Sequence, residues 1–245
     1  MTVNPAVYEL LNDYFTTEEI ICCIKNLKMG CSPGIDRIPA EFIITCQEQL
    51  VSNITMLFNY IIEQKEFPAM WVEGLKTPVP KPGNHDNAAN YGGITLLPIM
   101  AKLFEIAVNK RITFANEAFC HVDRNNGGFI KGSQTSDNIF ILQGLIQKQI
   151  TLGKSLYVCF VDFSKAFDIM NRHILFYKMI TSGMHGRVID TLMDMLRKTK
   201  CRIKTHGGLS PFIKYNCGVN QGGNLSPLLF RKYLADMSNY FEEPN

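Results

Sequence analysis

A short apolar run that ends in a single acid is the feature that most constrains the fold of this chain. Residues 156–161 are all apolar, and Asp162 follows them directly. A run this short and this rich in Val and aromatic residues is typical of a strand covered on both faces. Asp162 then lies at the carboxyl end of the strand, where open α/β sheets collect their ligands. Taken alone, the same acid also fits a helix cap or the start of a turn.

A second motif, at residues 218–230, opens with a glycine-rich turn and continues as a helical apolar pattern. The sequences FVDFSKAFD (160–168) and QGGNLSPLLF (221–230) resemble motifs A and B of reverse transcriptases from LINE-type (non-LTR) retrotransposons. Further matches lie at residues 32–36, 81–83, 91–97 and 128–137. The resemblance covers nearly the whole chain from about residue 16.

The resemblance implies an α/β (α+β) fold, the fingers and partial palm of a right-hand polymerase without a thumb. It places largely helical fingers at residues 1–155 and the partial palm, with motifs A and B, at residues 156–245. Apolar spacing independently predicts helices, which cover residues 17–29, 40–64 (one helix or two), 98–114, 136–152, 171–182, 188–196 and 225–240. Prolines make residues 75–80 an edge strand or a loop, and residues 200–215 read as a hairpin.

The resemblance also implies a nucleotide-binding and catalytic site. Asp162 is its catalytic acid and metal ligand, and the backbone of Phe163 adds a second oxygen. The nucleotide contacts that it implies are Lys81 for the triphosphate, Phe167 for the sugar, and Gln221 and Gly222 for the base pair. Core packing of Phe167 and a plain surface role for Lys81 are the alternatives.

The implied cofactor is Mg²⁺, with Mn²⁺ as a substitute, but the site is incomplete in this sequence. Two-metal polymerisation needs several carboxylates, and no two aspartates are adjacent anywhere in the chain. Asp236 stands alone in a predicted helix and reads as a surface residue. Motif positions that depart from the family are Gly92, Asn126, Ile130, Asn220, Gly223 and Asn224. We therefore expect a decayed or fragmentary copy that is inactive by itself.

Nucleic acid is the expected partner, as RNA template and DNA primer by resemblance. Residues 197–204 carry five positive charges and no acid, and we assign nucleic-acid contacts to Lys200, Arg202 and Lys204. A solvated basic face is the alternative for these three. The whole sequence has two alternative interpretations. It is either a nucleic-acid-binding remnant without catalytic activity or a chain too unstable to persist. The oligomeric state stays open.

Composition adds the cellular setting. A net charge of +3 and a pI near 8.4 permit a polyanionic partner without requiring one. The eight cysteines are scattered without metal-ligand spacing, which favours a reducing environment. The sequence shows neither a targeting signal nor a long apolar run. We expect an intracellular protein of the cytoplasm or nucleus that has no membrane partner.

Overall fold

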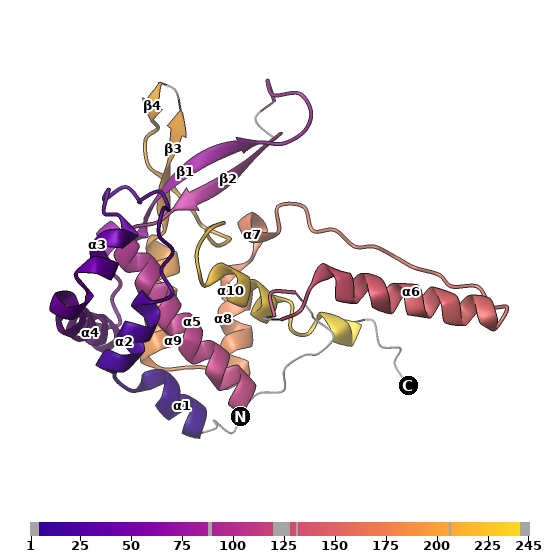
Figure 1. The fold of residues 1–245 in the computed structure, drawn as a ribbon, viewed down its shortest axis with the longest axis horizontal. Helices are drawn as coiled ribbons and strands as arrows, with labels where there is room; N and C mark the ends of the chain where they lie inside the picture. The colour runs from indigo at the N-terminus through magenta and orange to yellow at the C-terminus, as the bar shows by residue number, and fades with distance from the viewer. Residues whose placement is uncertain (1–4, 88–89, 120–127, 131, 206, 241–245) are drawn as a thin grey trace.

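The computed structural model describes residues 5–87, 90–119, 128–130, 132–205 and 207–240, and it has the predicted mixed α/β character (Figure 1). The helices are α1 (Pro5–Asn12), α2 (Thr17–Ile24), α3 (Ala40–Thr45), α4 (Gln47–Gln64), η1 (Ala69–Val72), α5 (Ile99–Phe119), α6 (Thr135–Thr151), α7 (Ala166–Ile169), α8 (Arg172–Thr181), α9 (Arg187–Lys198), α10 (Ser226–Tyr233) and η3 (Met237–Tyr240). Within the described ranges, no helix has both the length and the apolar character that a membrane crossing needs.

The strands form one small sheet above the helical part (Figure 1). They are β1 (Glu73–Pro80), β2 (Tyr91–Leu96), β3 (Lys200–Thr205), β4 (Gly208–Leu209) and β5 (Ile213–Lys214), in the order β2-β1-β3-β4, with β5 also on β3. β1 pairs antiparallel with β2 along its whole length, but its parallel pairing with β3 covers only Glu73–Lys76. The prolines at 78 and 80 therefore lie beyond the part of β1 that pairs with β3, where β1 is an edge strand. Proline lacks the N–H group that pairing on a second side would use, so it suits this position.

Helix ends follow local chemistry. The predicted capping box is confirmed, because the Thr16 hydroxyl accepts from the Glu19 N–H while the Glu19 carboxylate accepts from the Thr16 N–H. α2 ends at Ile24, five residues earlier than predicted. Asn26 explains this end, since its side chain donates to the Cys22 carbonyl and competes with the helix.

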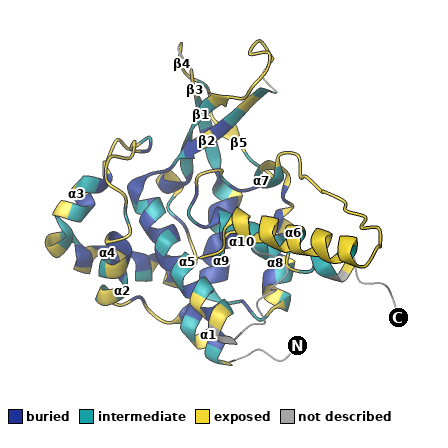
Figure 2. Cartoon of the chain, turned by 45° about the vertical axis from the view of Figure 1, so that its right-hand side comes forward, coloured by how far each residue is buried: buried dark blue, intermediate teal, exposed yellow. Residues whose placement is uncertain are grey.

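The core is one continuous apolar cluster in which α4, α5 and α9 meet the ends of the sheet (Figure 2). Its centre is aromatic, with the rings of Phe58, Phe67 and Phe104 fully buried in edge-to-face contacts. The five apolar residues predicted to form one face of α9 are all buried: Val188, Ile189, Leu192, Met195 and Leu196. Residues from both halves of the sequence thus share one core.

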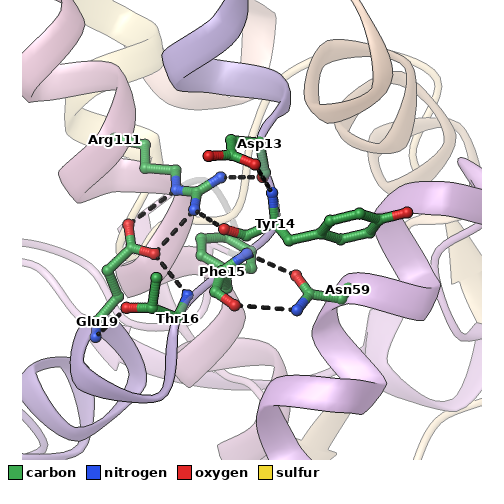
Figure 3. Close-up of polar contacts among 7 residues, drawn as sticks. All are labelled: Asp13, Tyr14, Phe15, Thr16, Glu19, Asn59 and Arg111. Atoms are coloured by element: carbon green, nitrogen blue, oxygen red, sulfur yellow. Dashed lines mark hydrogen bonds and ion pairs between the residues drawn. The ribbon is translucent and has the colours of Figure 1, made fainter.

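A buried arginine ties the N-terminal segment to α5 (Figure 3). Arg111 forms two hydrogen bonds with the Glu19 carboxylate, at 3.0 and 2.8 Å. The same guanidinium donates to the carbonyls of Asp13 and Tyr14 and stacks 4.0 Å from the centre of the Phe15 ring. Burial opposes the ionisation of Glu19, but the hydrogen bonds from Arg111 and Thr16 outweigh it and lower its pKa. The charge is therefore paired as a buried charge must be.

The segment from 132 to 165, called the arm below, departs most from the sequence predictions. α6 forms, yet none of its residues is buried, although Ile139, Phe140 and Leu145 were predicted to face the core. The predicted strand at 156–162 is wrong, because these residues form no regular element and are exposed, with Tyr157 93% and Phe160 82% accessible. Figure 1 shows α6 standing off the helical part and the following segment running back to α7. A strand needs a neighbour for its backbone groups, and the described residues offer this one none.

Candidate nucleotide-binding site

A cleft of about 800 Å³ opens beside the β1–β2 hairpin, between β3 and α7. Three of the predicted nucleotide contacts line it, although they come from distant parts of the chain: Lys81, Phe167 and Gln221. Two more lysines, Lys76 and Lys165, also line the cleft. The cleft therefore combines cationic groups with an aromatic ring and a loop, which suits a ligand with phosphates and a flat apolar part.

The motif B loop is fastened to β2. The Thr95 N–H donates to the Gln221 carbonyl at 2.8 Å, which fixes the loop against the strand. Gly222 has a φ of +115°, and a Cβ there would lie 2.8 Å from the Thr95 carbonyl oxygen. Sequence reasoning assigned Gly222 to a close approach of the bases. The structure supplies a nearer reason for glycine, which is the backbone of β2, and Gly222 does not line the cleft.

Glu105 is a site residue that sequence reasoning missed. It lies on α5, buried, and accepts hydrogen bonds from the N–H groups of Asn224 (2.5 Å) and Leu225 (3.4 Å) in the motif B loop. Burial raises the pKa of Glu105 to about 7, against the effect of these two donors and of Lys102. The available signal was a lone acid inside the apolar stretch 103–107 of the predicted helix 98–114.

Motif A is only partly built into the cleft. Phe167 packs against Phe230 of α10, with ring centres 5.2 Å apart, so it has both a core contact and a face in the cleft. Lys76 on β1 reaches Asp168 at 3.5 Å. Asp162 is exposed and lies in the arm, and it does not line the cleft. Phe163 follows it, and its ring approaches Phe230 at 6.4 Å.

The described residues do not fit the implied pair of metal ions. Nowhere in the described part of the chain do three His, Cys, Asp or Glu side chains gather closely enough to hold an ion. Asp236, predicted to be a surface residue, has a side chain that is 39% exposed and pairs with Lys178 at 2.5 Å. Asp162 and the Phe163 carbonyl alone are too few ligands for ions that prefer six oxygens.

The basic hairpin turns its charges away from the cleft. Cys201 and Ile203 line the cleft, so by strand alternation Lys200, Arg202 and Lys204 lie on the opposite face of β3. Lys200 pairs with Glu73 at 2.7 Å. On the same face, the Lys200 and Arg202 cations lie 4.4 and 5.0 Å from the centre of the Phe212 ring. The predicted nucleotide and nucleic-acid contacts are thus separated by the sheet.

Fold and site together define a protein of the right-hand polymerase class. Its mixed sheet carries motif B against β2 and part of motif A at the cleft. A family model described as "Reverse transcriptase (RNA-dependent DNA polymerase)" matches residues 79–244, and the chain belongs to this family. The resemblance to the LINE-type branch is also confirmed by the relatives.

Two curated relatives illustrate that branch. The chain is 29% identical to the probable RNA-directed DNA polymerase from transposon X-element of Drosophila melanogaster, over 84% of this chain and 23% of the relative. It is 25% identical to the RNA-directed DNA polymerase from mobile element jockey of Drosophila funebris, over 96% of this chain and 26% of the relative. The chain therefore spans about a quarter of the length of these relatives.

Among solved structures, the fold is similar to that of a chain in the structure titled "Partial Cas6-RT-Cas1--Cas2 complex", over 96% of this chain and 34% of that chain. The TM-score is 0.48 and the identity 14%.

Proposed function

We propose that this chain is the nucleotide-binding part of a LINE-type reverse transcriptase, and that by itself it does not polymerise. The observation that carries the proposal is the cleft, where Lys81, Phe167 and Gln221 converge from the β1–β2 hairpin, motif A and motif B. In this proposal residues 1–155 act as fingers and residues 156–245 as a partial palm. The chain is then a decayed or fragmentary copy of an RNA-directed DNA polymerase.

Each cleft residue has a role that follows from its chemistry. The Lys81 ammonium attracts the triphosphate of an incoming nucleotide, as a mobile point charge suits a flexible polyanion. Phe167 is held by Phe230 and offers its ring to the sugar. Gln221, fixed by its bond to Thr95, limits the cleft on the side of the base. These contacts bind and orient a nucleotide without any chemical step.

Divalent metal ions serve the reverse transcriptase family, but the proposal routes no step through them here. Asp162 and the Phe163 carbonyl are the ligands that the resemblance assigns, and they lie in the exposed arm rather than in the cleft. A metal-dependent transfer would need further carboxylates near Asp162. The proposal of an inactive chain rests on this ligand set and on the absence of adjacent aspartates in the sequence.

The test pairs nucleotide binding with primer extension. Wild-type chain should bind a fluorescent deoxynucleoside triphosphate, and Lys81→Gln and Phe167→Ala should each weaken binding by roughly tenfold. The same protein should extend no DNA primer on an RNA template with Mg²⁺ or Mn²⁺. Template-dependent extension that disappears in Asp162→Ala would refute the inactive state, and undiminished binding in both cleft variants would refute the nucleotide site.

Nucleic-acid binding without chemistry is a second candidate, favoured by the basic face of β3. Among the described residues no carboxylate pairs with Arg202 or Lys204, whereas Lys200 already neutralises Glu73. One N–H of Arg202, at Nε, donates to the Ser210 carbonyl. Replacing Lys200, Arg202 and Lys204 together with Ala should weaken binding to RNA and DNA of any sequence. The slope of log affinity against log salt should flatten by about two units rather than three. An unchanged slope would show that these three residues form a solvated surface and do not contact nucleic acid.

A further inference from the structure

A second groove, of about 520 Å³, lies between α8, α9 and the end of β5, and is called the α8–α9 groove below. Lys214 lines it, whereas Ile213, the residue before it, lines the nucleotide cleft. Successive residues of a strand point to opposite faces, so the groove and the cleft lie on opposite sides of β5. Tyr215, just past the strand, is the one described residue that lines both.

Arg172, the first residue of α8, is a buried cation that lines this groove. Its Nε donates to the Gly218 carbonyl at 2.8 Å, and its Nη1 donates to the carbonyls of Leu196 and Tyr215. Nη2 is buried and has no hydrogen-bond partner among the described residues. Burial lowers the pKa of Arg172, and no carboxylate in the described ranges opposes this shift. Because arginine keeps its charge when buried, this guanidinium lacks a counter-ion.

The hydrogen bonds of Arg172 bring it close to two more cations. Leu196, which accepts from Nη1, directly precedes Arg197, and Tyr215, which also accepts from Nη1, directly follows Lys214. Arg197 and Lys214 both line the groove and are exposed, with the Arg197 side chain 75% accessible. Three cations from α8, α9 and β5 therefore share one groove.

The groove also contains two acids, Asp190 and Asp194, but each already has a lysine partner. Asp190 pairs with Lys65 at 2.9 Å, and Asp194 pairs with Lys198 at 2.6 Å. Neither lysine lines the groove, so these pairs leave the cations of its lining in excess. An excess of positive charge in a concave surface favours an anion.

Lys214 also connects the groove to the basic face of β3. In the β3–β5 register Lys214 lies directly opposite Lys200, so both side chains stand on the same face of the sheet. Like charges in such a pair repel each other, and only Lys200 has a carboxylate partner, Glu73, among the described residues. Positive charge thus continues from β3 into the groove.

We propose that the α8–α9 groove is a phosphate-binding site, in which Arg197 and Lys214 contact a phosphate group that also balances the buried charge of Arg172. A guanidinium matches phosphate oxygens in geometry, and an ammonium adds a point charge. The phosphate comes either from free inorganic phosphate or from a nucleic-acid strand that lies along the basic face of β3. The site does not depend on the proposed nucleotide cleft, which lies on the other side of β5.

Inorganic phosphate is the probe, measured by calorimetry at fixed ionic strength in a phosphate-free buffer. The double variant Arg197→Gln with Lys214→Gln should bind it roughly tenfold more weakly than wild type. The matched control, Lys148→Gln with Lys154→Gln, removes the same charge from exposed positions outside the groove and should leave the affinity unchanged. Arg172→Gln should weaken binding as well. Circular dichroism checks that this buried variant folds, and the two exposed substitutions test the site without it.

A short oligothymidine strand separates the two sources of phosphate. Weaker binding of the strand by the double variant supports a strand phosphate in the groove, whereas unchanged strand binding with weaker phosphate binding supports the free anion.

Equal phosphate affinity of wild type and the double variant overturns the groove site, and so does a wild type that binds no phosphate. Phosphate binding that is lost in Lys81→Gln and kept in the double variant places the anion in the nucleotide cleft, and it too overturns the groove site. Phosphate binding that is lost in the double variant, with deoxynucleoside triphosphate binding intact, supports the groove and leaves the proposed nucleotide site standing.

Discussion

Two helices of nearly equal length, α4 and α6, show what an apolar pattern does and does not determine. α4 has 18 residues and buries six of them against α2 and α9, whereas α6 has 17 and buries none (Figure 2). Both segments are helical, and their residues have suitable helix propensity. Burial also needs a partner surface, and α6 has none among the described residues. The apolar run at 139–142 even continues around the helix instead of forming one stripe.

Hydrogen exchange should show the largest contrast between the core and the arm. Amides of α4 and α5 should be protected at least roughly a thousandfold more than those of α6, since an isolated helix of this length is marginal in water. Residues 156–162 should exchange fastest, because no backbone bonds to other described segments hold them. Strong protection throughout the arm would contradict the comparison and would indicate that another molecule covers it.

Matched phenylalanine substitutions should separate the same two regions by stability. Phe58→Ala removes a fully buried ring at the centre of the core and should lower the free energy of unfolding by about 3 to 5 kcal/mol. Phe140→Ala removes a ring that is 77% exposed, so its effect should stay within about 0.5 kcal/mol. Urea unfolding measures both. Similar losses in the two variants would show that α6 packs against something in solution.

The pH dependence of stability sharpens the comparison inside the core. The pKa of Glu105 is raised from 4.5 to about 7 by burial, so the folded chain holds this proton more tightly than the unfolded chain. The resulting stabilisation is complete below pH 4.5 and is lost as the pH rises to about 7. Relative to Glu105→Gln, wild type should lose up to about 3 kcal/mol across this window.

Urea unfolding of both proteins at a series of pH values gives this difference. Parallel curves for wild type and Glu105→Gln would show that the Glu105 carboxyl does not titrate in this range. A difference that grows with falling pH below 4.5 would have the wrong sign for a buried acid and would point to another group.

Much of the fold follows from the sequence wherever local chemistry and burial agree. The capping box at Thr16, the helical face of α9 and the hairpin at 200–215 are confirmed, since each is specified by residues close in sequence. The strand at 156–162 failed because a strand depends on a neighbour that its own residues cannot specify. The parallel β1–β3 contact was invisible for the same reason.

The candidate site shows the same contrast between features set by nearby residues and features set by residues distant in sequence. The motifs locate Lys81, Phe167 and Gln221, and these residues do meet at one cleft. The motifs placed Asp162 in the same site, but it lies outside the cleft. They gave no indication of Lys76 or Glu105, because the contacts of these two residues are with residues far away in sequence. Catalytic and nucleic-acid roles for Asp162, Lys200, Arg202 and Lys204 remain predictions.

The pairing of Glu73–Lys76 with residues 200–203 has a consequence for how the chain folds during synthesis. β1 emerges from the ribosome long before β3, and until then its second edge has no partner. We expect the hairpin β1–β2 to form first, and the closing of the large loop between β1 and β3 to be slow, because the entropy of this loop must be lost before the contact stabilises the sheet. Until β3 pairs with it, we expect the exposed edge of β1 to be a site where a nascent chain can associate with other unfinished chains.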